Sequence, residues 1–144
     1  MGDSASDVFE HRLQVRYGET DQMGRVHHAN FLLYVEEART KLLAAAGMPY
    51  AQVEREGVGL VVRDVSIRYR SAALYDDVLA IRTRVTDLRS ASVELGYEVH
   101  RAADETHIAS ATTRLACVNL RSDPPEVCLL PAALKSAFER ARGH

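Results

Sequence analysis

The feature that most constrains this fold is one long helical pattern followed by four consecutive strand patterns. Residues 30–47 carry apolar side chains at spacings of three or four, which predicts an amphipathic helix: Phe31, Val35, Ala38, Leu42 and Ala45. The strand patterns lie at 58–70, 77–88, 91–101 and 106–120, with short connections between them. Short connections favour antiparallel pairing, because parallel neighbours need a long crossover. The order therefore predicts an antiparallel sheet with one face covered by a helix.

Three further elements complete the predicted architecture. They are one half-buried strand and two short helices, at residues 8–17, 50–56 and 131–142. Asn30 is expected to cap the long helix and Gly47 to stop it. The prolines Pro124 and Pro125 are expected to end the sheet. The prediction is thus an α+β fold, with a five-stranded antiparallel sheet around one long helix and a short C-terminal helix.

The strand pattern at 58–70 assigns a different role to each face of the sheet. One face of this strand is expected to lie in the core, with Val61, Val65, Ile67 and Tyr69. The opposite face of the sheet is expected to be partly polar because it carries several arginines: Arg68, Arg70, Arg82, Arg84 and Arg114. Exposed sheet edges favour pairing with a second copy, so we expect at least a dimer.

Length and composition restrict the classes of protein to which the chain can belong. The 144 residues suit a single domain, 1–144, and the net charge of -2 gives no sign of nucleic-acid binding. No apolar run approaches the roughly 20 residues of a transmembrane helix. Residues 1–7 lack the features of a signal peptide and are expected to be disordered. Cys117 and Cys128 are expected to be free thiols, which favours the reducing cytoplasm.

The candidate chemistry lies in the loop at 18–28, which leads directly into the long helix. A helix N-terminus has unpaired N–H groups and a partial positive charge, so it can hold an oxyanion. A neighbouring carboxylate would supply the base or nucleophile that acyl hydrolysis also needs. Glu19 and Asp21 both lie here, and residue types alone do not separate them. Asp21 could equally form an Asx-turn with residues 22–24.

The same segment carries a specific motif, Glu-Thr-Asp-x-Met-Gly-x-Val-x-x-x-Asn-Phe-Leu, at residues 19–32. It resembles the signature of hot-dog acyl-CoA thioesterases, especially the 4-hydroxybenzoyl-CoA and Tol–Pal-associated types. Similarity continues through residues 34–39 and 65–77, and covers roughly residues 10–120. The resemblance implies a hot-dog fold, hydrolysis of acyl-CoA without a cofactor, and an active site between the subunits of a homodimer or homotetramer.

The resemblance also implies roles for individual residues. Asp21 matches the catalytic aspartate, which attacks the thioester carbonyl or activates water, and the backbone N–H of His28 matches the group that polarises this carbonyl. Residues expected at the substrate are His27, Phe31, Val61, Val62 and Arg70. His27 could bond to Asp21 or to the leaving thiolate, or simply face solvent. His27 and Phe31 stand where the family often has tyrosine, and Arg25 where it often has histidine or valine. The resemblance implies that these side chains line or adjoin the acyl pocket, so the acyl preference is not carried over.

Several alternatives stay open. Glu36 in the helix is a reserve base, although a solvated or interface role suits it as well. Arginines that could bind the phosphates of coenzyme A, or could lie on a solvated face, are Arg63, Arg68, Arg70 and Arg89. A metal site is disfavoured because adjacent histidines diverge and no third ligand is suitably spaced. The competing functions are release of acyl chains from a carrier protein, a hydratase, and a non-catalytic acyl-binding protein.

Overall fold

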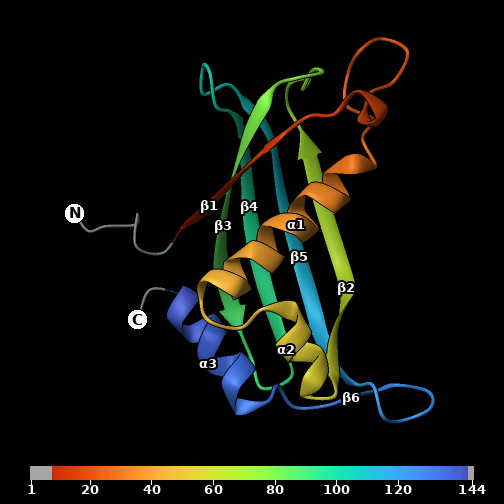
Figure 1. Cartoon of the computed structure of the whole chain (residues 1–144), viewed down its shortest axis with the longest axis vertical. Helices are drawn as coiled ribbons and strands as arrows, with labels where there is room; N and C mark the ends of the chain where they lie inside the picture. Colours follow the sequence, from red (N-terminus) through yellow and green to blue (C-terminus); the bar gives the residue numbers. More distant parts are fainter. Residues whose placement is uncertain (1–7, 143–144) are drawn as a thin grey trace.

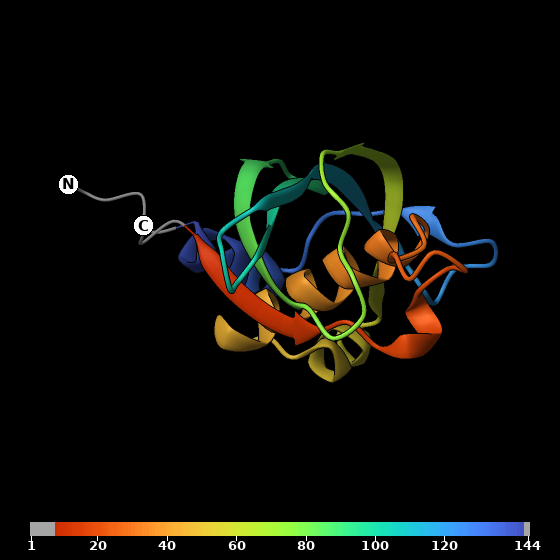
Figure 2. The ribbon, with the colours of Figure 1, turned by 90° about the horizontal axis from the view of Figure 1, so that it is seen from above.

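The structure, a computed structural model, describes residues 8–142, so the expected disorder of residues 1–7 lies outside the described part. One antiparallel sheet curls around helix α1 (Asn30–Ala45), as Figures 1 and 2 show. Its strands run in the order β1-β3-β4-β5-β2, and β6 pairs with the end of β5. Their bounds are Phe9–Gln14 (β1), Val58–Tyr69 (β2), Val78–Leu88 (β3), Ser92–Arg101 (β4), His107–Asn119 (β5) and Glu126–Val127 (β6). The predicted α+β architecture is confirmed, but the pairing expected between the strand patterns at 58–70 and 77–88 is wrong, because β2 pairs with β5 while β3 lies between β1 and β4.

Three short helical segments accompany α1. They are the 3-10 turn η2 (Tyr17–Glu19), α2 (Tyr50–Arg55) and α3 (Ala132–Ala141). Gly47 follows α1 with a φ of 91°, a conformation that glycine adopts without steric cost, so the predicted stop is confirmed. No helix in the described residues is long and apolar enough to cross a bilayer.

Two local predictions are wrong. Asn30 does not cap α1, because the cap position is Ala29 and the Asn30 side-chain amide donates instead to the carbonyl of Glu19, at 2.8 Å. Pro124 and Pro125 do not end the sheet, because the chain turns back after them and forms β6, which pairs with β5. In both places a partner outside the element itself decides the local structure.

The core lies between α1 and the concave face of the sheet. Helix α1 buries Phe31, Tyr34, Val35, Ala38, Leu42 and Leu43. Facing them are fully buried sheet side chains, among them Leu79, Ile81, Leu95, Tyr97 and Leu115. Each large apolar side chain that is buried contributes about 1.5–3 kcal/mol. This packing holds the first turn of α1 rigidly over the sheet.

Strand β2 differs from the other long strands because it is the last strand in the order and one of its edges is unpaired. Val65 and Tyr69 are paired with the buried Thr113 and Ala109, so they point toward the core side of the sheet, as predicted. They are nevertheless 45% and 47% exposed, so their predicted burial is wrong. A bulge after Val62 also shifts the register, so Val61 and Val65 do not share a face.

The two cysteines lie side by side near the junction of β5 and β6. Their Sγ atoms are 3.6 Å apart, and both are free thiols, as predicted. Cys117 is buried, and this burial, together with the contact to Cys128, raises the pKa of its thiol to about 12. Cys117 therefore stays protonated at neutral pH and packs as a small apolar side chain.

Candidate active site

The loop between η2 and α1 is held by backbone hydrogen bonds. The N–H of Asp21 donates to the carbonyl of Arg25 at 2.7 Å, and the N–H of Val26 donates to Ala73 at 2.8 Å. Gly24 adopts a φ of 77°, which a glycine provides without strain. The loop is thereby tied both to itself and to the segment that follows β2.

Asp21 forms the Asx-turn that residue types alone had suggested. Its Oδ1 accepts from the N–H groups of Met23 (2.8 Å) and Arg25 (3.2 Å). Its Oδ2 has no hydrogen bond to any residue of the described chain, and the residue is exposed. The turn therefore orients the carboxylate through one oxygen and leaves the other available to a ligand.

Glu19 has a different environment. Its Oε1 accepts from the hydroxyl of Tyr34 on α1 (2.8 Å) and from the N–H of Arg16 (2.9 Å). Tyr34 is buried, and burial together with the hydrogen bond to Glu19 raises the pKa of its hydroxyl well above the usual value. Glu19 thus fastens the loop to the helix, which separates it from Asp21.

A cavity of about 340 Å³ opens beside Asp21. It is lined by Asp21, Arg25, Val26, His28, Phe31, Tyr69, Arg70 and residues 71–73. Four of the residues predicted at the site, Asp21, His28, Phe31 and Arg70, therefore line one cavity. The cavity combines a carboxylate, two arginines and an aromatic wall.

His28 lies in the turn that precedes α1. Within residues 8–142 its backbone N–H has no hydrogen-bond acceptor, so this donor is available near the positive end of the helix dipole. Its carbonyl accepts from the hydroxyl of Tyr69 at 3.0 Å, and the two rings meet edge to face with centroids 6.4 Å apart. Tyr69 also contacts Phe31, at 5.4 Å between centroids. The end of β2 thus supports the N-terminus of α1.

Sequence reasoning missed Tyr69 as a cavity residue. Tyr69 was assigned only to the core face of a strand, because the strand pattern carries no information about which loop lies opposite its end. Arg25, which the resemblance placed in or beside the acyl pocket, does line the cavity. A bridge between Arg25 and Leu74 brings the two chain segments together, and only the tertiary structure reveals that pairing.

Other predicted site residues lie elsewhere. The ring of His27 stacks on that of His28 at 4.4 Å, and its Nδ1 accepts from the N–H of Ala29, with no hydrogen bond to Asp21. Val61 and Val62 are about half exposed on β2 and do not line the cavity within one chain. Glu36 lines a separate cavity of about 200 Å³ between α1, α2 and β2. No group of three metal-binding side chains is found among the described residues.

Comparison with known proteins identifies the family. The model of the thioesterase-like superfamily matches residues 15–138, most of the chain. The chain belongs to the thioesterase-like superfamily. It is therefore an enzyme of the thioester hydrolase class, and the hot-dog fold expected from the loop motif is confirmed.

Individual members of the superfamily match along most of the chain. The chain is 36% identical over 118 residues to a putative acyl-CoA thioesterase, YneP, of Bacillus subtilis, with 82% of this chain and 85% of that protein covered. It is 30% identical over 135 residues to the acyl-CoA thioesterase YbgC of Haemophilus influenzae, covering 93% and 96%. The crystal structure of a hypothetical protein, TT1821, from Thermus thermophilus superposes with a TM-score of 0.83 at 33% identity, covering 92% and 95%.

Proposed function

We propose that this superfamily member hydrolyses acyl-CoA thioesters to a free acid and coenzyme A, with Asp21 as the catalytic carboxylate. The observation that carries the proposal is the shared cavity of Asp21 and His28, in which one carboxylate oxygen and one backbone N–H have no hydrogen-bond partner among residues 8–142. The names of the relatives in Bacillus subtilis and Haemophilus influenzae support acyl-CoA as the substrate class.

The proposed chemistry uses the two groups together. The N–H of His28 donates to the thioester carbonyl oxygen, and the N-terminus of α1 stabilises the negative charge that develops there. Asp21 either attacks the carbonyl carbon, which forms a mixed anhydride and releases the thiolate, or removes a proton from an attacking water. Water then cleaves the anhydride in the first route. Either route needs no cofactor, because a thioester is already activated.

Tyr69 supports this geometry as a positioning residue. Its hydroxyl donates to the carbonyl of His28, so it orients the peptide unit that precedes α1. Phe31 and Tyr69 together form an apolar wall at the cavity. We propose that this wall contacts the acyl group.

The proposal extends to a homodimer built on β2. This strand has an unpaired edge, and Val61, Val62 and Val65 are 44–49% exposed on it. An unpaired strand edge with uncovered apolar side chains suits pairing with a second copy. Such pairing would give Val61 and Val62 the substrate-binding role expected of them. The free thiols Cys117 and Cys128 support a cytoplasmic location.

The test is a thiol-release assay across aliphatic and aromatic acyl-CoA thioesters. We expect the wild type to release the thiol and the Asp21→Asn variant to lose this activity. Turnover of carrier-bound thioesters only would favour the carrier-protein alternative, and binding without any turnover would favour an acyl-binding protein. Light scattering after gel filtration measures whether the dimer forms, and a monomer would contradict the β2 pairing.

A further inference from the structure

Cys117 and Cys128 are directly opposed at the junction of β5 and β6. The register of this ladder pairs Val118 with Val127, and one step further along it the two cysteines face each other. The N–H of Cys128 donates to the carbonyl of Cys117 at 2.9 Å. Opposed residues of antiparallel strands have Cα atoms about 4.5–5.5 Å apart, and disulfides span about 4.4–6.8 Å between Cα atoms. The backbone therefore has the spacing of a cross-strand disulfide.

The two thiols lie on the same face of the sheet and are in contact. Their Sγ atoms are 3.6 Å apart, and a disulfide bond needs about 2.0 Å. Because the backbone spacing already fits, small rotations of the side chains are enough to close this gap. Cys117 is buried, whereas Cys128 is partly exposed. A small oxidant from solvent therefore reaches Cys128 first.

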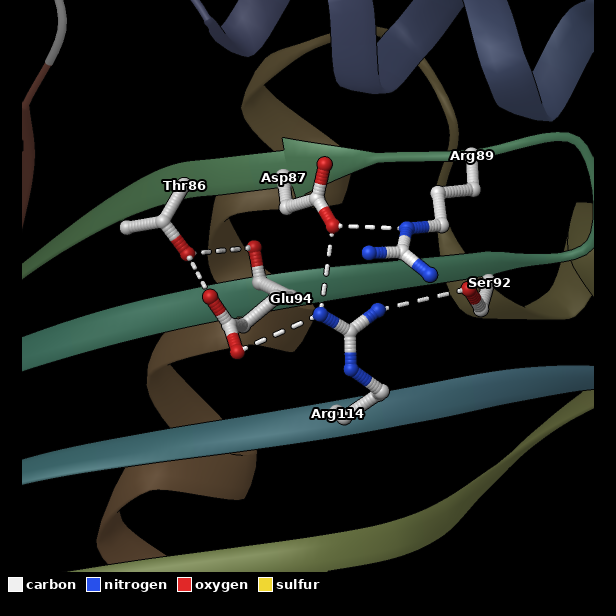
Figure 3. Close-up of polar contacts among 6 residues, drawn as sticks. All are labelled: Thr86, Asp87, Arg89, Ser92, Glu94 and Arg114. Atoms are coloured by element: carbon white, nitrogen blue, oxygen red, sulfur yellow. Dashed lines mark hydrogen bonds and ion pairs between the residues drawn. The ribbon is translucent and has the colours of Figure 1, made fainter.

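The turn between β3 and β4, beside the cysteines, is held by a network of ion pairs, drawn in Figure 3. Arg114 of β5 contacts Asp87 of β3 at 3.1 Å and Glu94 of β4 at 3.3 Å. Arg89, directly after β3, contacts the same oxygen of Asp87 at 2.9 Å. The hydrogen bond from Arg114 lowers the pKa of Asp87 below its usual value. The network thus ties three strands together at the base of this turn.

The same turn anchors the backbone on both sides of the thiol pair. The N–H of Cys117 donates to the carbonyl of Ala91, and the N–H of Leu130 donates to the carbonyl of Ser90, both at 2.9 Å. Leu130 is buried and leads into α3. Each cysteine is therefore held by a backbone hydrogen bond at its own residue or close to it, so the two thiols stay in contact.

The segment between the cysteines is held much less firmly. Its only strand, β6, consists of Glu126 and Val127, which are both exposed and pair with two residues of β5. Residues 120–127 are exposed except for Ser122. A covalent bond between residues 117 and 128 would close this segment into a loop and reduce the freedom of the unfolded chain.

We propose that Cys117 and Cys128 form a reversible disulfide when the protein meets a peroxide, and that this bond locks β6 and the segment leading to α3 onto the sheet. The sulfur of Cys128 attacks the O–O bond of the peroxide, becomes a sulfenic acid and releases one water. The sulfur of Cys117 then attacks the sulfur of Cys128, which forms the S–S bond and releases the second water. Two thiols lose two electrons, and hydrogen peroxide gains them. An added dithiol reverses the reaction by exchange.

Treatment of the full chain with hydrogen peroxide tests the pair. After denaturation, the number of reactive thiols in the wild type should fall from two to none, and the intact mass should fall by two hydrogen atoms. The Tm should rise by about 8 °C over that of the protein treated with dithiothreitol. Cys128→Ser is the matched control. Its Tm should not rise with peroxide, and its buried Cys117 should keep its thiol.

Three results would overturn the proposal: loss of the Cys128 thiol alone, a disulfide between two chains on a non-reducing gel, or an oxidised wild type with no rise in Tm. Cys117→Ala tests the second step. Its sulfenic acid at Cys128 should persist and be trapped by dimedone, whereas in the wild type Cys117 should consume it. Equal trapping in the two proteins would contradict the role of Cys117. None of these measurements requires turnover of acyl-CoA, so they decide the disulfide whether or not the proposed function holds.

Discussion

Glu19 and Asp21 are two residues apart in one loop, yet their carboxylates have opposite surroundings. Glu19 accepts hydrogen bonds from Tyr34 and Arg16 and lies against the helix. Asp21 is held through Oδ1 alone, with Oδ2 open to the cavity that contains His28. A carboxylate that is satisfied by protein donors contributes to stability, whereas one with a free oxygen remains available for chemistry. The loop thus separates an acid that is held by protein donors, Glu19, from the proposed catalytic acid, Asp21.

The largest effect should follow Asp21→Asn. The amide oxygen can still accept from Met23 and Arg25, so the turn survives, but the base or nucleophile is lost. We expect kcat to fall by at least about 100-fold, with an unchanged melting temperature. Thiol release and thermal unfolding measure the two quantities. Full activity in this variant would contradict the assignment of Asp21.

For Tyr34→Phe, which changes the contact of Glu19, we expect the reverse: a loss of stability with little loss of activity. This substitution leaves the Glu19 carboxylate without its partner from α1. The loss of a hydrogen bond to a charged group should lower the free energy of unfolding by about 1.5–3 kcal/mol. Activity at 25 °C should change only a few-fold. Urea denaturation measures the free energy of unfolding. A loss of kcat that is larger, when expressed as a free energy, than the loss in the free energy of unfolding would remove the distinction between the two acids.

The pH dependence of stability provides a finer test of the same contact. Burial and Glu19 raise the pKa of Tyr34 above its unfolded value of 10.0. The stabilisation is therefore fully present below about pH 10 and is lost at higher pH, as the unfolded tyrosine ionises first. Between pH 10 and 11 the wild type should lose up to about 1.4 kcal/mol more than Tyr34→Phe. If the stabilities of the wild type and of Tyr34→Phe fall in parallel between pH 10 and 11, the Tyr34 hydroxyl is not a buried neutral group.

The smallest effect is expected for Tyr69→Phe, on the Asp21 side. The substitution removes the hydrogen bond to the carbonyl of His28 and keeps the ring contacts with Phe31. A net loss of about 1 kcal/mol in positioning should lower kcat about 5-fold. The midpoint of urea unfolding should change little. Unaltered kcat would indicate that the packing of α1 alone positions His28.

Sequence patterns predicted the elements well, because their signals are local. The 3.6-residue spacing of Phe31, Val35 and Ala38 requires no knowledge of what they contact, and the strand ranges agree with β2–β5 to within two residues. Resemblance, rather than residue chemistry, selected Asp21 over Glu19. The cap of α1 and the end of the sheet were predicted incorrectly, because the Asn30 side chain bonds to the carbonyl of Glu19 and the chain turns back after the prolines to pair β6 with β5.

What the sequence by itself determined is the long helix, the five main strands with their antiparallel sense, and the motif that contains Asp21. The tertiary structure alone decided that β2 is the edge, that Tyr69 supports His28, and that Arg70 lines the same cavity as Asp21. The physical reason is the range of the interactions. Periodicity records which side of an element is apolar, whereas strand pairing and the contacts between loops join residues that are tens of positions apart.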